Sequence, residues 1–132
     1  MSTEEKLSVL SQLIAFARNG KKLKSVEYDF LIIIANQIGV SKETFDLLLD
    51  NPVPHIALQS ESQRIVQFHR LLLLMNIDRE IEIVELENIH QLGLKMGLNI
   101  QAIDKTLEVM SQYKNNNIPP QVLMDIFKTY YN

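Results

Sequence analysis

Two stretches of this chain repeat one another, and their alignment limits the secondary structure that both can form. A shift of 58 residues, without a gap, places 13–50 over 71–108. Six positions are then identical, namely Leu13/Leu71, Val26/Val84, Glu27/Glu85, Gly39/Gly97, Asp46/Asp104 and Leu49/Leu107. Because each copy of a repeat forms the same unit, a structure assigned to one copy must also suit the other.

The repeat decides the one ambiguous segment of the chain, the apolar run 30–35. Its three isoleucines are β-branched and would also suit a buried strand. The residues opposite it, 88–93, read Asn-Ile-His-Gln-Leu-Gly, which fits an amphipathic helix and no strand pattern. Both copies are therefore predicted to be helical.

Start and stop signals divide the chain into about seven helices. Ser2 with Glu5 and Ser60 with Gln63 have the spacing of capping boxes. Gly39 tolerates the left-handed conformation that ends many helices, and Gly97 repeats this signal. Further N-caps and first-turn prolines are Ser41, Asn99, Pro119 and Pro120. The expected helices cover about 2–18, 25–39, 41–49, 61–76, 82–96, 99–113 and 119–132.

The fourth of these helices is expected to be the buried centre of the fold. Its residues 71–75 are all apolar, and five apolar residues in succession cover every side of a helix. We therefore predict an all-α bundle, built as one domain over 1–132. Two pseudo-repeats, 13–50 and 71–108, pack around 61–76, and a C-terminal helix is added.

Composition excludes several classes of protein. The chain has 132 residues and no cysteine, which rules out a disulfide framework and thiolate chemistry. Its apolar runs are too short to span a bilayer, and the polar start Ser2 to Lys6 is unlike a signal peptide. A formal charge of −3 gives no general attraction to nucleic acid. We expect a cytoplasmic protein without membrane insertion or a nucleic-acid partner.

The two charged turns carry a family resemblance. They lie in 17–27 and 75–85, between long helices, and each keeps an apolar residue followed by a glutamate: Leu23 with Glu27, and Ile81 with Glu85. Together with the duplicated helices, this pattern resembles the TerB-like (tellurite-resistance) superfamily over about 5–112. The resemblance implies a small cytoplasmic helical domain linked to metal-ion stress and membrane-proximal complexes. Some members bind divalent cations through acidic turns.

The second turn holds the densest group of carboxylates, Asp78, Glu80, Glu82 and Glu85. Hard cations such as Ca²⁺ prefer several such oxygen ligands from one loop. An EF-hand is excluded, because Ile83 stands where that loop needs glycine and Ile89 where it needs glutamate. The alternative is that acidic residues simply favour the first turn of a helix, where they face its positive dipole end.

The first turn is basic, with Arg18, Lys21, Lys22 and Lys24. Such a cluster suits weak contact with an anion or a nucleic acid, whereas a solvated corner of the fold is the plainer interpretation. We also hypothesise that the basic turn lies near the acidic one and offsets its repulsion. The chain would then need no cofactor, and a divalent cation would bind no more tightly than millimolar.

The histidines and serines form no catalytic motif. Glu87 and His90 make one Glu-x-x-His step, but a di-iron bundle needs two. No Gly-x-Ser-x-Gly, phosphate loop or His-Glu-x-x-His occurs. We therefore predict that the chain is not an enzyme.

The last helix offers a surface for a partner. Its apolar face would normally pack on its own domain, but Phe127, Tyr130 and Tyr131 could form an exposed aromatic anchor. The sequence thus favours a non-enzymatic cytoplasmic module that binds another, unidentified protein. The alternative is a divalent-cation-binding domain of a metal-stress response, using the turn 78–85. Self-association is left open.

Overall fold

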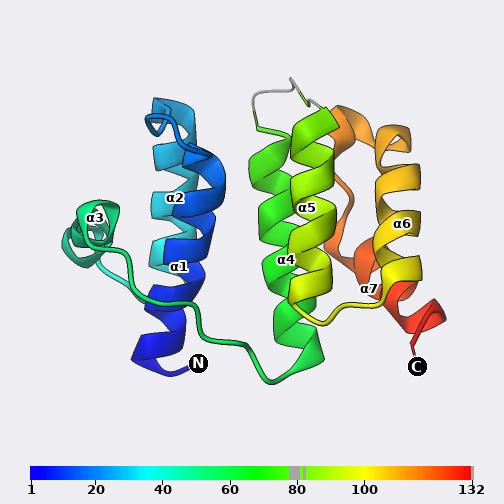
Figure 1. The fold of residues 1–132 in the computed structure, drawn as a ribbon, viewed down its shortest axis with the longest axis horizontal. Helices are drawn as coiled ribbons and strands as arrows, with labels where there is room; N and C mark the ends of the chain where they lie inside the picture. Colours follow the sequence, from blue (N-terminus) through cyan, green and yellow to red (C-terminus); the bar gives the residue numbers. More distant parts are fainter. Residues whose placement is uncertain (78–80, 82, 132) are drawn as a thin grey trace. The chain divides into compact units, whose positions relative to one another are not determined.

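The computed structural model describes residues 1–77, 81 and 83–131, and within these ranges every regular element is a helix (Figure 1). This confirms the predicted all-α class and the helical state of 30–35. The chain divides into two compact units, Met1–Ala57 and Leu58–Asn132. A single domain over 1–132 stays a prediction. None of the helices in the described ranges has the length and apolar character needed to cross a bilayer.

The first unit contains α1 (Thr3–Arg18), α2 (Ser25–Gln37) and α3 (Lys42–Asp50), and each helix contacts the other two. Their fully buried side chains include Leu10, Leu13, Leu31 and Phe45. The segment after α3 runs back along α1. There the backbone N–H groups of Val53 and Ile56 donate to the hydroxyls of Ser11 and Ser8, over 3.1 and 2.8 Å.

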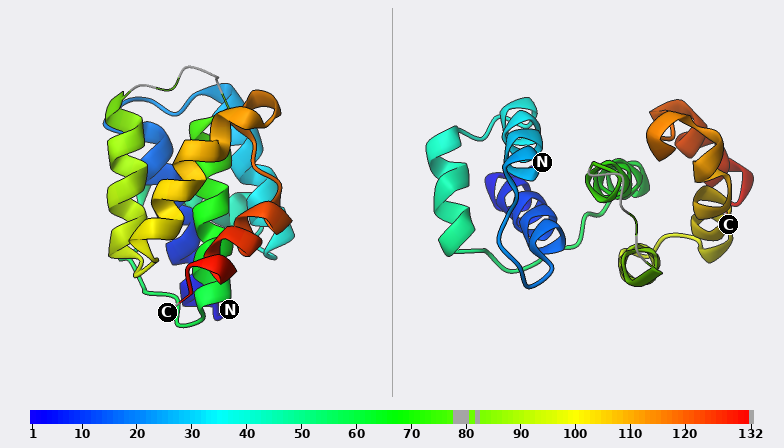
Figure 2. Two further views of the ribbon diagram at one scale, coloured as in Figure 1. Left: turned by 90° about the vertical axis from the view of Figure 1, so that its right-hand side faces the viewer. Right: turned by 90° about the horizontal axis from the view of Figure 1, so that it is seen from above.

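The second unit contains α4 (Glu61–Met75), α5 (Ile83–Lys95), α6 (Ile100–Val109) and α7 (Pro120–Thr129), with short 3₁₀ turns η1 (Met110–Gln112) and η2 (Lys114–Asn116) before α7. Contacts run from α4 to α5, α5 to α6, α6 to α7 and α7 back to α4, so the four helices enclose one interior (Figure 2). The connector before α7 is held against α4. Asn76 Nδ2 donates to the Asn116 carbonyl over 2.8 Å, and His69 Nε2 lies 2.8 Å from that of Ile118.

The helix predicted as the buried centre, α4, is buried on most of its sides. Leu71, Leu72, Leu74 and Met75 are all at most 3% exposed, whereas Leu73 is partly exposed. Within its unit α4 packs against both α5 and α7. A helix that is apolar on every side over this run therefore packs against neighbours on more than one side.

The local signals place the helix ends largely as predicted. Ser2 and Glu5 form the reciprocal capping box, and Ser41 and Asn99 cap α3 and α6. At Ser60 only half of the predicted box forms. The N–H of Gln63 donates to the Ser60 hydroxyl, which also pairs with Ser62 over 2.7 Å. The sixth helix ends at Val109, earlier than predicted, and continues as η1.

The two copies of the repeat agree in local geometry. Helices α2 and α5 both have 13 residues, and their bounds differ by the same 58 residues that align the sequences. Gly39 and Gly97 follow them with φ of 83° and 77°, as predicted for left-handed helix stops. These agreements concern helix ends and turns. The duplication of the whole fold stays a prediction.

Candidate partner-binding groove

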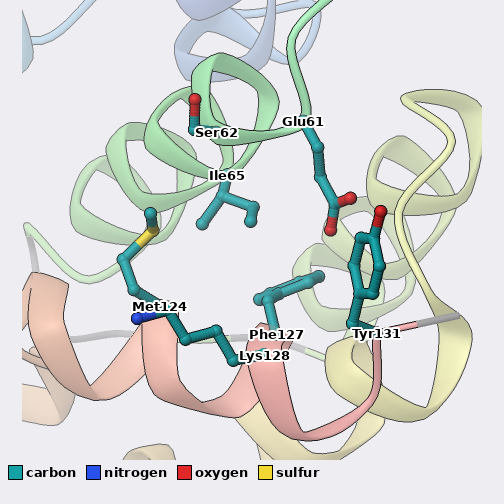
Figure 3. A pocket seen from close by; sticks show the side chains of 7 residues that line it. All are labelled: Glu61, Ser62, Ile65, Met124, Phe127, Lys128 and Tyr131. Atoms are coloured by element: carbon teal, nitrogen blue, oxygen red, sulfur yellow. The ribbon is translucent and has the colours of Figure 1, made fainter.

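A groove lies in the second unit between the start of α4 and the end of α7 (Figure 3). Its volume is about 320 Å³. Seven residues line it, namely Glu61, Ser62, Ile65, Met124, Phe127, Lys128 and Tyr131. The first three come from the first two turns of α4, and the others from the last turns of α7 and the residues after it.

The sequence of α7 explains why this helix has one buried and one open face. Pro120 occupies the first helical turn, where the missing N–H costs nothing. Leu123 and Phe127, four residues apart, are 1% and 2% exposed and hold the helix against its unit. Met124 and Lys128, also four residues apart, share the neighbouring face, and Tyr131 follows just after the end of α7; all three line the groove.

The floor of the groove is apolar and firmly packed. Ile65 is 5% exposed, and the Phe127 ring meets that of Phe68 edge to face, with centroids 6.2 Å apart. Such aromatic pairs add about 0.5–1.5 kcal/mol beyond their burial. The floor is therefore a fixed surface, to which a ligand would have to adapt.

The rim carries two opposite charges. In Figure 3 the Lys128 ammonium lies on the Met124 side of the groove, and the Glu61 carboxylate points toward the Tyr131 hydroxyl on the other side. Neither Lys128 nor Glu61 forms an ion pair with another described residue. The groove can therefore offer apolar contact in its middle and one charge of each sign at its ends.

The predicted aromatic anchor is only partly assembled here. Tyr131 is 71% exposed and lines the groove, whereas Phe127 is a core residue whose ring forms part of the floor. Tyr130 is half-buried and does not belong to the lining. In the sequence, the spacing of Met124, Lys128 and Tyr131 could have indicated the side of the groove that α7 forms. No local sequence pattern indicates that residues of α4 form the other side.

The predicted anion-binding residues surround the turn between α1 and α2. Arg18 is partly buried, and its Nη1 donates to the Leu49 carbonyl over 2.6 Å, which ties α1 to α3. Lys21 and Lys22 are exposed. Lys24 is the N-cap of α2, where its backbone N–H donates to Glu27 Oε1 over 2.9 Å. Arg18 thus already has a structural role.

Three of the four predicted metal ligands, Asp78, Glu80 and Glu82, lie outside the described residues. The fourth, Glu85, is half-buried in the first turn of α5. Within residues 1–77, 81 and 83–131, no three histidine or acidic side chains are grouped so that they could hold a metal ion.

The two aspartates that the repeat aligns both connect neighbouring helices. Asp46 on α3 accepts a hydrogen bond from the Tyr28 hydroxyl of α2 over 2.6 Å and from Lys42 Nζ over 3.0 Å. Asp104 on α6 lies 2.9 Å from His90 Nε2 of α5. His90 is therefore engaged within its own unit.

The contact between Tyr28 and Asp46 changes how both residues titrate. The hydrogen bond from Tyr28, followed by that from Lys42, lowers the pKa of the Asp46 carboxyl, because both donors favour the charged form. The same carboxylate raises the pKa of Tyr28 and that of Lys42. This cluster joins α2 to α3 within the first unit, whereas the groove belongs to the second unit.

Comparison with known proteins adds no relative: no family model, curated protein or solved structure matches the chain.

Proposed function

We propose that this chain is a non-enzymatic, cytoplasmic protein-interaction module, and that the α4–α7 groove receives its partner. The observation that carries the proposal is the fixed apolar floor of Ile65 and Phe127 beside the exposed Tyr131. Tyrosines beside apolar pockets are enriched among residues that dominate binding energy, since the ring supplies area and the hydroxyl a polar contact. The TerB-like resemblance of 17–27 and 75–85 supports the same class of function.

The exposed lining of the groove, rather than its volume, favours a protein partner. At about 320 Å³ it falls at the lower end of the range of about 300–1,000 Å³ that is typical of small-molecule sites. Exposed Ser62, Lys128 and Tyr131 line it, so a small ligand would keep much of its surface in water. A side chain projecting from a larger partner would be better covered.

The alternative function, binding of a divalent cation by the turn 78–85, stays a prediction from the sequence.

The proposal is tested by closing the groove. Ser62 is exposed at the rim, and Ser62→Trp would place an indole over the groove without touching its buried floor. Ser111→Trp is the matched control, because Ser111 is exposed in η1 and does not line the groove. Thermal melts monitored by circular dichroism verify that both variants fold.

Each full-length chain is immobilised and exposed to an extract of the source organism. We expect a protein that the wild type and Ser111→Trp retain and that Ser62→Trp loses. Identical capture by all three chains would contradict a role for the groove.

A further inference from the structure

We propose that the groove recognises an amphipathic helix of the partner, which places one large aliphatic side chain over Ile65 and Phe127, an acidic residue at Lys128 and a basic residue at Glu61. This inference rests on the proposed function and specifies the chemistry of the partner.

The floor of the groove argues for a single apolar anchor. Ile65 and Phe127 are buried to at least 95%, and Met124, which closes one side, is half-buried. Little of the floor itself is open to water, so the apolar surface that an anchor could cover belongs mainly to Met124 and to the exposed ring of Tyr131, at roughly 25 cal/mol per Å². The small volume leaves room for one or two side chains and excludes a long apolar stripe.

The all-helical architecture of the described ranges favours a helix as the ligand of the groove. Strand addition needs an open sheet edge, and within the described ranges every regular element is a helix. Polyproline ligands dock between two exposed aromatic faces. Of the two aromatic residues that line this groove, Tyr131 is exposed but Phe127 is only 2% exposed, so the second face is missing. Insertion of a side chain from a helix requires only a groove between helices, which α4 and α7 provide.

The two rim charges specify what flanks the anchor. Lys128 and Glu61 lie at opposite ends of the groove and have no ionic partner among the residues that the structure describes (Figure 3). A helix with one charge of each sign, a turn before and a turn after its anchor, would satisfy both. A helix with two like charges would meet repulsion at one end, which disfavours that partner.

The probes are synthetic helical peptides of about 15 residues, long enough to form helix. Each has a central leucine, and the flanking positions one turn away carry Glu and Lys, two Lys or two Glu. Binding to the full-length chain is measured by fluorescence anisotropy at low salt. We expect the Glu/Lys peptide to bind about 3- to 10-fold more tightly than either like-charged peptide, the range for exposed pairs in which attraction replaces repulsion.

Charge reversal then redirects the preference. Lys128→Glu leaves two acidic rim residues and should bind the two-lysine peptide best, whereas Glu61→Lys should favour the two-glutamate peptide. Lys114→Glu is the matched control, because Lys114 is an exposed lysine outside the groove and its change should leave the order unaltered.

Two outcomes separate this inference from the proposed function. If the leucine peptides bind, lose binding on Ser62→Trp and show no charge preference, the charge assignment is wrong and the groove still binds partners. If no peptide binds in a manner that Ser62→Trp abolishes, a helical anchor in this groove is excluded.

Discussion

The rings of Phe68 and Phe127 meet edge to face, with centroids 6.2 Å apart and planes inclined at 74°. Phe68 lies on α4 and Phe127 on α7, and both are at most 2% exposed. This contact fixes the last helix on its unit and supports the Phe127 ring, which forms part of the floor of the groove. Stability and the proposed binding surface therefore depend on the same residue, Phe127.

Removing this ring should destabilise the protein strongly. Phe127→Ala deletes a fully buried aromatic side chain and leaves a cavity, which typically costs about 3–5 kcal/mol. Tyr131→Ala is the control, because the ring is 71% exposed and its loss should change stability by no more than about 0.5 kcal/mol. Urea unfolding measures both values. Equal costs would show that α7 does not pack as described.

The helix stop at Gly97 should discriminate alanine from asparagine. Its φ is 77°, and a Cβ there would meet nothing within 4 Å, so only the backbone conformation opposes substitution. Gly97→Ala should therefore cost about 1–2 kcal/mol. Gly97→Asn should cost clearly less, since asparagine tolerates positive φ, as Asn19, Asn115 and Asn116 do here. Equal losses for the two variants would contradict the left-handed stop.

The Asp46 carboxylate should stabilise the fold only above acidic pH. Its pKa is lowered in the folded state, so its contribution is present above the unfolded pKa of about 4 and is lost as pH falls through the folded pKa. Asp46→Asn should thus be less stable than the wild type at pH 7, and the difference should shrink by pH 3. Urea unfolding at both values measures this change.

The control for this pH dependence is Asp29→Asn, on the same helix as Tyr28. Asp29 is exposed and accepts no side-chain hydrogen bond from the residues that the structure describes. At pH 7, Asp46→Asn should therefore lower the free energy of unfolding, whereas Asp29→Asn should leave it nearly unchanged. A stability gap for Asp46→Asn that persists unchanged at pH 3 would show that the charge of Asp46 is not its source.

The acidic turn 78–85 should bind divalent cations with a Kd of about 1 mM or weaker. The sequence predicts this because the basic turn at 18–24 is hypothesised to offset the repulsion among the carboxylates. A ligand at 100 times its Kd adds about 2.7 kcal/mol to stability. Thermal melts with micromolar Ca²⁺, Mg²⁺, Mn²⁺ or Zn²⁺ should therefore leave the midpoint unchanged. Micromolar binding by calorimetry that disappears on Glu80→Gln with Glu82→Gln would instead favour the metal-binding alternative.

Local signals predicted most of the fold. Ser41, Asn99 and Pro120 act within one helical turn of themselves, and Gly97 ends α5 through its own φ, so neighbours in sequence suffice. The end of α6 at Val109 was misplaced, because its periodicity continues into η1 while the backbone tightens.

The groove could not be predicted in the same way. Its two sides come from α4 and α7, and which turns of two helices meet is set by packing across the unit. Phe127 shows the difficulty, because a large aromatic residue near a chain end fits an exposed anchor and a buried core position equally well. Only its contact with Phe68 decides that it belongs to the core.

The central claim is that the α4–α7 groove binds a helix from a partner, and backbone NMR of the full-length chain tests it most directly. The ¹H–¹⁵N spectrum is titrated with the peptide that carries Glu, Leu and Lys. We predict that the largest shift changes fall on the groove residues Ser62, Ile65, Met124, Lys128 and Tyr131, and that Ser62→Trp suppresses them. Saturable shift changes confined to other residues, or none at millimolar peptide, would contradict the claim.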